Sequence, residues 1–370
     1  MKRIVTLMLV MAMLLCIAAG CGKKPDDEMD MPEVITADAA ETPTPSTTPK
    51  PTSEPNPETT PEAPAFFNPL TGEPVEEDIS GNRPVAIMIN NVQSAQPLHG
   101  ISEASVIYEM PVEGWLTRMI ALFQEYEELD VVGSVRSARP CFVEVADAYD
   151  ALYFHAGGSD DGMNLIWEYG VNNVSATEYD GVYFYRDDWR MNNLGMEHSL
   201  MTTGELLVKA IERMEYSTVH DDDYAQTMVF AEDGTPANGE NGEHFTVWYS
   251  EDFKTSEFTY DAEAGAYGMH QWGEDLYDAN TDEQVFFENV IIIITTIYPY
   301  DAAAHQYVDF ESGGEGYFFS GGKYIPITWE KPETGAPFEY RDENGELVTF
   351  GVGSTFVCVT SDESSVIEID

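Results

Sequence analysis

Residues 22–65 limit, more than any other feature, how this chain can fold. The stretch ETPTPSTTPKPTSEPNPETTPEAP has Pro or Thr at almost every second position and no stripe of apolar residues. Such a composition cannot bury a core, and it favours an extended, polyproline-like chain that rises about 3.1 Å per residue. We therefore interpret residues 22–65 as a disordered tether and expect folded structure from residue 66 onward.

The residues before the tether have the pattern of a bacterial lipoprotein signal. Two basic residues precede an apolar run that is too short for an ordinary membrane span. The run leads into AAGC, residues 18–21, which resembles a lipobox although Leu is usual where Ala18 stands. We predict a signal peptide over 1–21, diacylglycerol on Cys21 and anchoring at the outer face of the plasma membrane. An ordinary secretory signal with an incidental cysteine is the alternative.

The bulk composition narrows the class of protein. The chain is 43% hydrophobic and 12% aromatic, which favours packed, β-rich structure after the tether. Its formal net charge of -50 argues against nucleic acid as a partner, because phosphates need a basic surface. After the signal and Cys21, the two remaining cysteines are Cys141 and Cys358. We expect both to be buried, unpaired thiols.

The folded part divides into two segments by its pattern. Residues 66–218 mix strand-like runs, such as RPVAIMIN at 83–90, with helical spacing over 141–152 and 202–214. This mixture predicts an α/β or α+β domain. Residues 219–242 are polar and rich in turn formers, which is typical of a connection between domains.

The second segment, 243–362, predicts a different architecture. Strand-like runs such as VFFENVIIIITTIY and STFVCVT alternate with Gly- and Asp-rich turns, and the pair Asn344-Gly345 predicts a hairpin. We expect a β-rich, mainly antiparallel domain, either a barrel or a sandwich, followed by a short tail over 363–370.

Several quoted stretches together resemble the YerB-like bacterial lipoproteins. They include NRPVAIMINN, GSVRSARPCFVEVADAYDALYFHAGGS and MEHSLMTT in the first segment, and ENVIIIITTI with GYFFSGGKYIPITWEK in the second. The resemblance covers about residues 66–362 and implies a two-domain lipoprotein, without supplying catalytic residues. The chain departs from the usual pattern at Trp115, where Gly is common, and at Ser199, where Asn is common beside the preceding histidine.

Arginine is scarce and concentrated in the first segment. Lys and Arg total 17 against 67 Asp and Glu. Six of the nine arginines lie between residues 83 and 190: Arg83, Arg118, Arg136, Arg139, Arg186 and Arg190. In GSVRSARP, residues 133–140, a strand end leads into a helix, and backbone N–H groups at a helix start favour anions. We predict that Arg118, Arg136 and Arg139 bind a carboxylate or phosphate there.

Nearby carboxylates offer a second reading of the same arginines. Glu109 and Glu113 are four residues apart, so a regular strand would place them on one face, although Pro111 interrupts the pattern. Such a pair can perform acid–base chemistry or hold a cation. The simpler interpretation is that these acids, or Glu144, form ion pairs with the arginines.

His155, Ser159 and His198 complete the candidate ligand-binding set. FHAGGSD brings His155 and Ser159 close to two glycines, and glycines let a backbone approach a ligand. Both histidines can orient a ligand or act as bases, but a structural role is the commoner one. The chain has no CxxC, H-E-x-x-H, G-x-S-x-G or Walker motif, so we predict neither a metal site nor a cofactor.

These observations lead to one expectation and two alternatives. We expect a lipid-anchored extracytoplasmic protein that binds an anionic component of the bacterial envelope in an Arg-rich cleft. The first alternative is an enzyme acting on cell-wall material through its Glu and His side chains. The second is a scaffold for other envelope proteins in which the arginines are structural.

Overall fold

One large sheet is the centre of the computed structural model, which describes residues 65–221, 224–250, 254–361 and 366–370. The predicted signal peptide, Cys21 and the predicted tether up to residue 64 lie outside the described residues. The large sheet has 11 strands, ten of them in one continuous order. In that order they are β12 (Glu240–Asn241), β24 (Lys323–Glu330), β23 (Gly314–Ser320), β20 (Asn289–Ile294), β27 (Thr355–Thr360), β4 (Val106–Pro111), β5 (Thr117–Phe123), β3 (Val85–Asn91), β7 (Leu152–His155) and β8 (Asn173–Ser175).

The sheet joins the two sequence segments directly. Strand β27, from the end of the chain, pairs in parallel with β4 from Thr355 opposite Val106 to Cys358 opposite Glu109. On its other side β27 pairs in parallel with β20. The described residues from 65 onward accordingly belong to one compact unit. Backbone hydrogen bonds thus join the two predicted segments, 66–218 and 243–362. The segments still differ in secondary structure, since the first combines helices with strands and the described part of the second is mainly strands.

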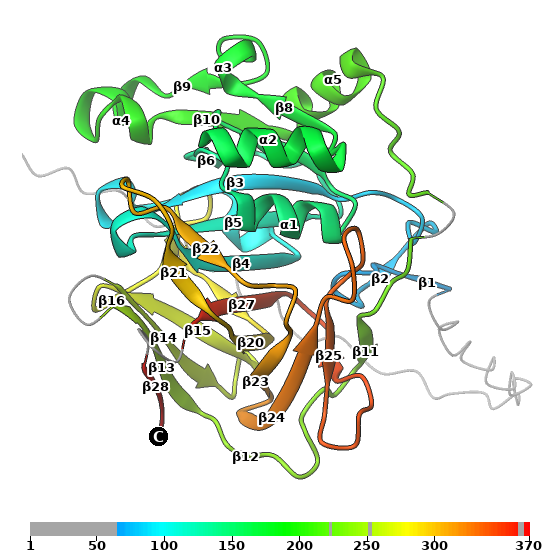
Figure 1. Cartoon of the computed structure of the whole chain (residues 1–370). Helices are drawn as coiled ribbons and strands as arrows, with labels where there is room; N and C mark the ends of the chain where they lie inside the picture. The colour runs from blue at the N-terminus through cyan, green and yellow to red at the C-terminus, as the bar shows by residue number, and fades with distance from the viewer. Residues whose placement is uncertain (1–64, 222–223, 251–253, 362–365) are drawn as a thin grey trace, which may run out of the picture. The chain divides into compact units, whose positions relative to one another are not determined.

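The middle of the sheet is covered on both faces. Every residue of β3, β4, β5 and β27 is buried, which matches their nearly continuous apolar sequences. On one face, Phe142 of α1 (Pro140–Ala148) packs in the same apolar cluster as Met88 and Ile120. On the opposite face, Phe245 and Phe258 of a second sheet share a cluster with alternate strand residues such as Ile87. Figure 1 shows α1 in front of the strands and the second sheet below.

Smaller elements surround this core. The second sheet contains six strands: β16 (Glu274–Asp275), β15 (Ala266–Gln271), β14 (Lys254–Asp261), β13 (His244–Ser250), β28 (Val366–Ile369) and β19 (Phe286–Phe287). A three-stranded sheet contains β6 (Val131–Gly133), β10 (Leu200–Thr203) and β9 (Tyr185–Arg186). Paired ribbons contain β21 (Ile297–Pro299) with β22 (Gln306–Val308), β11 (Val229–Ala231) with β26 (Thr349–Gly351), β17 (Tyr277–Asp278) with β18 (Glu283–Gln284), and β1 (Phe66–Phe67) with β2 (Pro74–Val75). Strand β25 (Glu339–Arg341) extends the main sheet beside β24.

The helices start where the sequence supplies a cap. Besides α1, the α-helices are α2 (Asp160–Tyr169), α3 (Ala176–Tyr179), α4 (Asp188–Asn193) and α5 (Gly204–Met214). The hydroxyl of Ser159 accepts a hydrogen bond from the N–H of Gly162 at the start of α2. Thr203 caps α5 in the same way, and Leu207, Ala210 and Ile211 form its buried stripe.

The predicted fold class is confirmed. The first segment mixes strands with five α-helices, and the described part of the second contains strands that pair mostly antiparallel. The hairpin predicted at Asn344-Gly345 is also present, with Arg341 bridged to Leu347 across the turn. Helix α1 ends at Ala148, before the predicted limit of 152, because Leu152 already begins β7.

Candidate functional site: an arginine cluster at the carboxyl ends of the strands

The candidate site lies at one edge of the main sheet. Strands β3 and β7 run parallel, β5 is antiparallel to both β3 and β4, and β27 is parallel to β4. The carboxyl ends of β3, β4, β7 and β27 therefore meet at the same edge. Ligands of open α/β sheets generally bind outside the carboxyl ends of the strands. We call this region the carboxyl edge.

Residues 135–138 fill the space where β3 and β7 separate at the carboxyl edge. Val135 bridges Ile89, the N–H of Arg136 donates to the Met88 carbonyl at 2.9 Å, and its carbonyl accepts from Ala156 at 2.9 Å. Small residues are needed here, since a Cβ on Gly158 would lie 3.2 Å from the Cβ of Ala138. This placement fixes the backbone of Arg136 between two strand ends.

Arg118 and Arg139 share one carboxylate. The Glu113 Oε1 accepts from Arg118 Nη2 at 2.6 Å and from Arg139 Nη2 at 2.6 Å, while Oε2 accepts from Arg139 Nε at 2.9 Å. Burial acts to raise the pKa of Glu113, but the Arg139 hydrogen bonds and the Arg118 charge lower this pKa to about 2. Glu113 is therefore ionised throughout the neutral range.

The positive charge at this point exceeds what Glu113 neutralises. Burial, followed by the charge of Arg139, lowers the pKa of Arg118 to about 10, and Arg136 adds to the same effect. The geometry agrees: Arg118 and Arg139 both bond Glu113 Oε1, and Arg118 Nη1 donates at 3.1 Å to the carbonyl of Ser137, the residue after Arg136. Within 4.0 Å the three guanidinium groups meet two carboxylates, Glu113 and Glu197, so three positive charges face two negative ones.

Arg136 is the least satisfied member of the cluster. Its nearest carboxylate oxygen is 4.0 Å from Nη2 and belongs to Glu197, whose side chain is 64% exposed. Its Nε is buried without a hydrogen-bond partner in the described part of the chain. A buried donor without a partner costs free energy that an incoming acceptor would recover.

His155 and Ser159 have structural partners. His155 is fully buried, with Nδ1 2.8 Å from the Gly157 carbonyl and Nε2 3.1 Å from Asn173 Oδ1. Burial lowers the pKa of His155, so its imidazole is neutral at neutral pH. The Ser159 hydroxyl serves as the cap of α2. Both residues hold the loop that borders residues 135–138.

His198 lies beside Arg136 through their common neighbour Glu197. Its Nδ1 is 2.8 Å from the Asn90 amide nitrogen, and its Nε2 is 3.2 Å from Ser94 Oγ and 3.4 Å from Glu197 Oε1. Burial lowers the pKa of His198, against the opposing effect of the Glu197 charge. His198 and Arg136 therefore share Glu197 as a neighbouring carboxylate.

Glu109 lies in a separate, fully buried network. Its Oε1 is 3.1 Å from Lys254 Nζ and accepts from Asn91 and Thr117, while Oε2 accepts from Ser256 at 2.7 Å. The carboxylate pair that a regular strand would give is not formed, because Glu113 follows the strand. Glu113 instead pairs with Arg118 and Arg139, in line with the simpler interpretation of its role. Glu144 likewise bonds elsewhere, to Tyr169 and Lys331.

Lys254 and Ser256 were missed in the sequence analysis. Burial lowers the pKa of Lys254, which also packs 4.8 Å from the centre of the Trp272 ring. The signal was available in the alternation of KTSEF, which puts Lys254, Ser256 and Phe258 on the buried face of β14. An inward lysine in a strand needs a buried acid.

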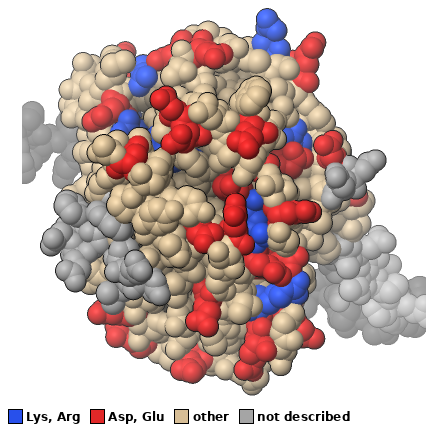
Figure 2. All heavy atoms as spheres, in the orientation of Figure 1, with Lys and Arg blue, Asp and Glu red and all other residues tan. Residues whose placement is uncertain are grey.

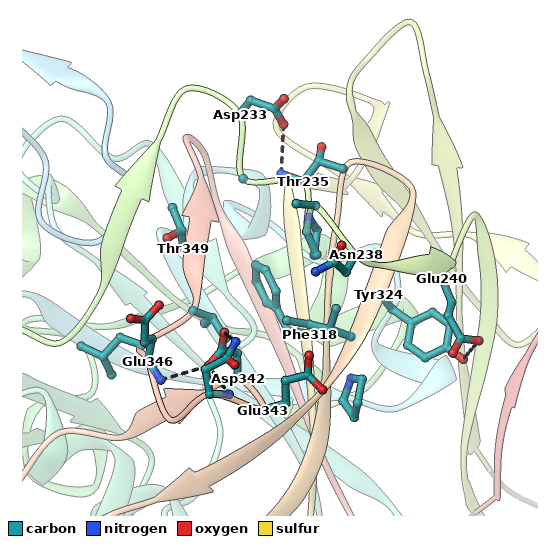
Figure 3. A pocket seen from close by; sticks show the side chains of 18 residues that line it. Asp233, Thr235, Asn238, Glu240, Phe318, Tyr324, Asp342, Glu343, Glu346 and Thr349 are labelled. Atoms are coloured by element: carbon teal, nitrogen blue, oxygen red, sulfur yellow. Dashed lines mark hydrogen bonds between the residues drawn. The ribbon is translucent and has the colours of Figure 1, made fainter.

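The larger surface hollows are not lined by Arg118, Arg136 or Arg139, although one of about 290 Å³ is lined in part by Arg83. Figure 3 shows a hollow of about 490 Å³ in which Asp342, Glu343 and Tyr324 surround Phe318. A second hollow, of about 280 Å³, is lined by Glu73, Glu103, Glu125 and Glu288 among other residues. Neither is lined by Lys or Arg. Figure 2 shows the same imbalance over one face, where Asp and Glu outnumber small patches of Lys and Arg.

In the described ranges, we find no group of side chains arranged for metal binding and no pair of cysteines. No cluster of three or more His, Cys, Asp or Glu there is arranged to hold a metal ion. Cys141 and Cys358 are buried and unpaired, and burial raises the pKa of Cys141 to about 12. Among residues 65–370, none of the described helices has the length and apolar content that a membrane crossing requires.

Comparison with known proteins accounts for both segments. Residues 70–217 match the DUF3048 N-terminal domain and residues 245–357 match the DUF3048 C-terminal domain, both described as domains of unknown function. The chain is 29% identical over 297 residues to "Putative lipoprotein YerB" of Bacillus subtilis (strain 168), covering 80% of this chain and 86% of that protein.

A solved structure agrees with the sequence relationship. The crystal structure of the YerB protein from Bacillus subtilis superposes with a TM-score of 0.71 at 27% identity, covering 82% of this chain and 99% of that chain. The YerB-like resemblance is thereby confirmed across the described fold. The chain belongs to the DUF3048 family of YerB-like proteins, and it carries both the N-terminal and the C-terminal domain of that family.

Proposed function

We propose that this protein is a lipid-anchored component of the bacterial envelope that binds an anionic ligand at the carboxyl edge. Anchoring through diacylglycerol on Cys21 is supported by the AAGC stretch and by a relative described as a lipoprotein. The Pro- and Thr-rich residues 22–65 would carry the binding domain away from the outer face of the membrane. The ligand would be a carboxylate- or phosphate-bearing envelope component.

One observation carries the binding proposal: within the described residues Arg136 has a buried Nε without a partner, and the neighbouring Ser137 carbonyl accepts from Arg118, which shares Glu113 with Arg139. In a chain with a net charge of -50, any local excess of positive charge attracts anions more specifically than the rest of the surface. Arg136 would contact the ligand. Arg118 and Arg139, which share Glu113, would contribute their charge, and Ser159, His155 and His198 would hold the surrounding loops.

The observed pairings also favour a second candidate function. Arg118 and Arg139 are bound to Glu113, and Arg190 donates to three backbone carbonyls, of Ala95, Pro97 and His198. Arginines used in this way are typical of a rigid scaffold for other proteins. The enzyme alternative has less support, because Glu109 and His155 are fully buried and hydrogen-bonded.

Anion titration separates these functions. The chain from residue 22 onward would be titrated with glucuronate and with inorganic phosphate by calorimetry, at low salt. The Arg136→Ala variant is expected to bind at least one of the two anions about tenfold more weakly. A tenfold loss of affinity corresponds to about 1.4 kcal/mol of binding free energy. Arg341→Ala is the matched control, because Arg341 is also partly exposed and paired, with Glu339. Equal binding by the wild type and Arg136→Ala would support the scaffold and contradict the anion site.

A further inference from the structure

A two-stranded ribbon carries a pair of exposed tyrosines, and its turn contacts the first turn of α2. Strands β21 and β22 pair so that Tyr298 lies directly opposite Tyr307. Their ring centres are 5.1 Å apart, and the residues are 45% and 39% exposed. The neighbours on the opposite face, Ile297 and Val308, are buried. One face of the ribbon is therefore anchored in the protein and the other presents a pair of aromatic rings.

The ribbon is joined to the cluster through the first turn of α2. The hydroxyl of Tyr300, the residue after β21, donates to Asp161 Oδ2 at 2.9 Å. The next residue, Gly162, lies so close to Arg139 that a Cβ on it would be 3.3 Å from the Arg139 Cα. The charge of Arg139 also acts on the pKa of Tyr300, which burial and Asp161 raise.

We propose that Tyr298 and Tyr307 form a stacking platform for sugar rings, and that the ligand of the carboxyl edge is a glycan with carboxylate groups. This inference rests on the proposed anion-binding function. Aromatic rings offer apolar faces against which the C–H face of a pyranose can pack, while the hydroxyl tips remain hydrated. Arg136 would bind the carboxylate of one sugar while the tyrosines bind the ring of another.

The charges around the ribbon favour binding of a neutral sugar at the tyrosines and of the carboxylate at Arg136. Burial raises the pKa of Tyr307, and the carboxylates of Asp309 and Glu311 raise it further, so the phenol stays neutral. Asp161 and Asp301 act on Tyr300 in the same sense. An acidic ring bound over these tyrosines would be repelled, whereas a neutral sugar would not. The ligand would therefore place its carboxylates on the arginines and its neutral sugars on the ribbon.

Two oligosaccharides of the same length test the proposal. The chain from residue 22 onward would be titrated with a tetrasaccharide of alternating N-acetylglucosamine and N-acetylmuramic acid, and with neutral chitotetraose. The acidic tetrasaccharide is expected to bind at least tenfold more tightly. Tyr298→Ala/Tyr307→Ala should weaken it about tenfold and leave binding of the N-acetylmuramic acid monosaccharide unchanged, whereas Tyr298→Phe/Tyr307→Phe should retain the affinity.

Controls keep the outcome decisive. Tyr277→Ala removes a tyrosine of similar exposure, 43%, from another part of the surface and should change nothing. Should the double alanine variant fold poorly, Tyr298→Thr/Tyr307→Thr removes the rings and keeps good strand formers. Unchanged tetrasaccharide binding in the tyrosine variants, with loss in Arg136→Ala, overturns the glycan platform alone. Unchanged binding in Arg136→Ala as well overturns the anion site, and preference for polyglycerol phosphate over the tetrasaccharide overturns the choice of glycan.

Discussion

Glu109 and Glu113 are four residues apart, yet they meet their positive partners in opposite ways. Glu109 is fully buried and pairs one to one with Lys254, with Asn91, Thr117 and Ser256 completing its hydrogen bonds. Glu113 lies partly exposed at the carboxyl edge and is shared by two arginines with a third nearby. A balanced, enclosed pair is suited to holding two sheets together, and an unbalanced cluster whose Arg136 and Glu113 are partly exposed is suited to a ligand.

The largest effect is expected from breaking the balanced pair. Lys254→Met would leave the Glu109 carboxylate buried without a counter-charge, at a cost of about 3–5 kcal/mol in the free energy of unfolding. Urea denaturation measures this change. The double variant Glu109→Gln/Lys254→Met should recover most of the loss, because no charge is left buried. A single-variant loss below about 1 kcal/mol would mean that the pair is not structural.

Neutralising the shared carboxylate should have a smaller effect on stability and a distinct pH signature. Glu113→Gln is expected to cost about 1–3 kcal/mol at pH 7, because Arg118 is largely buried and loses its anion. Since the folded-state pKa of Glu113 is lowered from 4.5 to about 2, its stabilisation is complete above pH 4.5 and is lost as the pH falls toward 2. Unfolding curves of both proteins should therefore converge over that window. Parallel curves would contradict the assigned role of Glu113.

Removing Arg136 should separate binding from stability. Its side chain has one weak ion pair, so Arg136→Ala is expected to change the free energy of unfolding by no more than about 0.5 kcal/mol. Anion affinity should nevertheless fall, and the remaining binding should depend less on salt. Thermal melting with and without added glucuronate measures both quantities. A large loss of stability without loss of binding would make Arg136 a structural residue.

The smallest expected effect concerns His155. Burial lowers the pKa of His155 below the ordinary value of 6.5, so the folded state binds this proton less readily than the unfolded state does. Protonation of His155 therefore favours unfolding. Stability should be complete above pH 6.5 and decline as the pH falls below it, well before Glu113 titrates. A His155→Gln variant should be less stable at pH 7.5 but show a flatter pH profile between 6.5 and 5. An unchanged slope would place the acid sensitivity on His198 or elsewhere.

Most of the fold could be predicted from local pattern. The apolar run of β3, the Pro140 helix start and the Asn344-Gly345 turn each follow from residues close together in sequence. The continuous sheet could not be predicted, because the pairing of β27 with β4 joins residues about 250 positions apart. Sequence spacing grouped Glu109 with Glu113, but Pro111 ends β4 and the chain turns between them.

The candidate site was likewise predictable where it depended on local sequence and not where it depended on long-range contacts. The crowding of arginines near residue 136 was visible as composition, and the structure joins Arg118 and Arg139 through Glu113, with Arg136 paired to Glu197. Glu113 was one of several candidate partners that only tertiary contacts could select. The role of Lys254 depends on its burial against Glu109 of a distant strand. The alternation in β14 indicates that Lys254 is buried, but it does not indicate which acid is the partner.

A crystal structure of the chain with a carboxylate-bearing sugar tests the central claim most directly. The surplus of positive charge at the carboxyl edge predicts a ligand carboxylate within hydrogen-bond distance of the Arg136 guanidinium, with the Glu113 pairings to Arg118 and Arg139 retained. A sugar carboxylate bound only at another surface, with the Arg136 guanidinium still contacting protein alone, would contradict it.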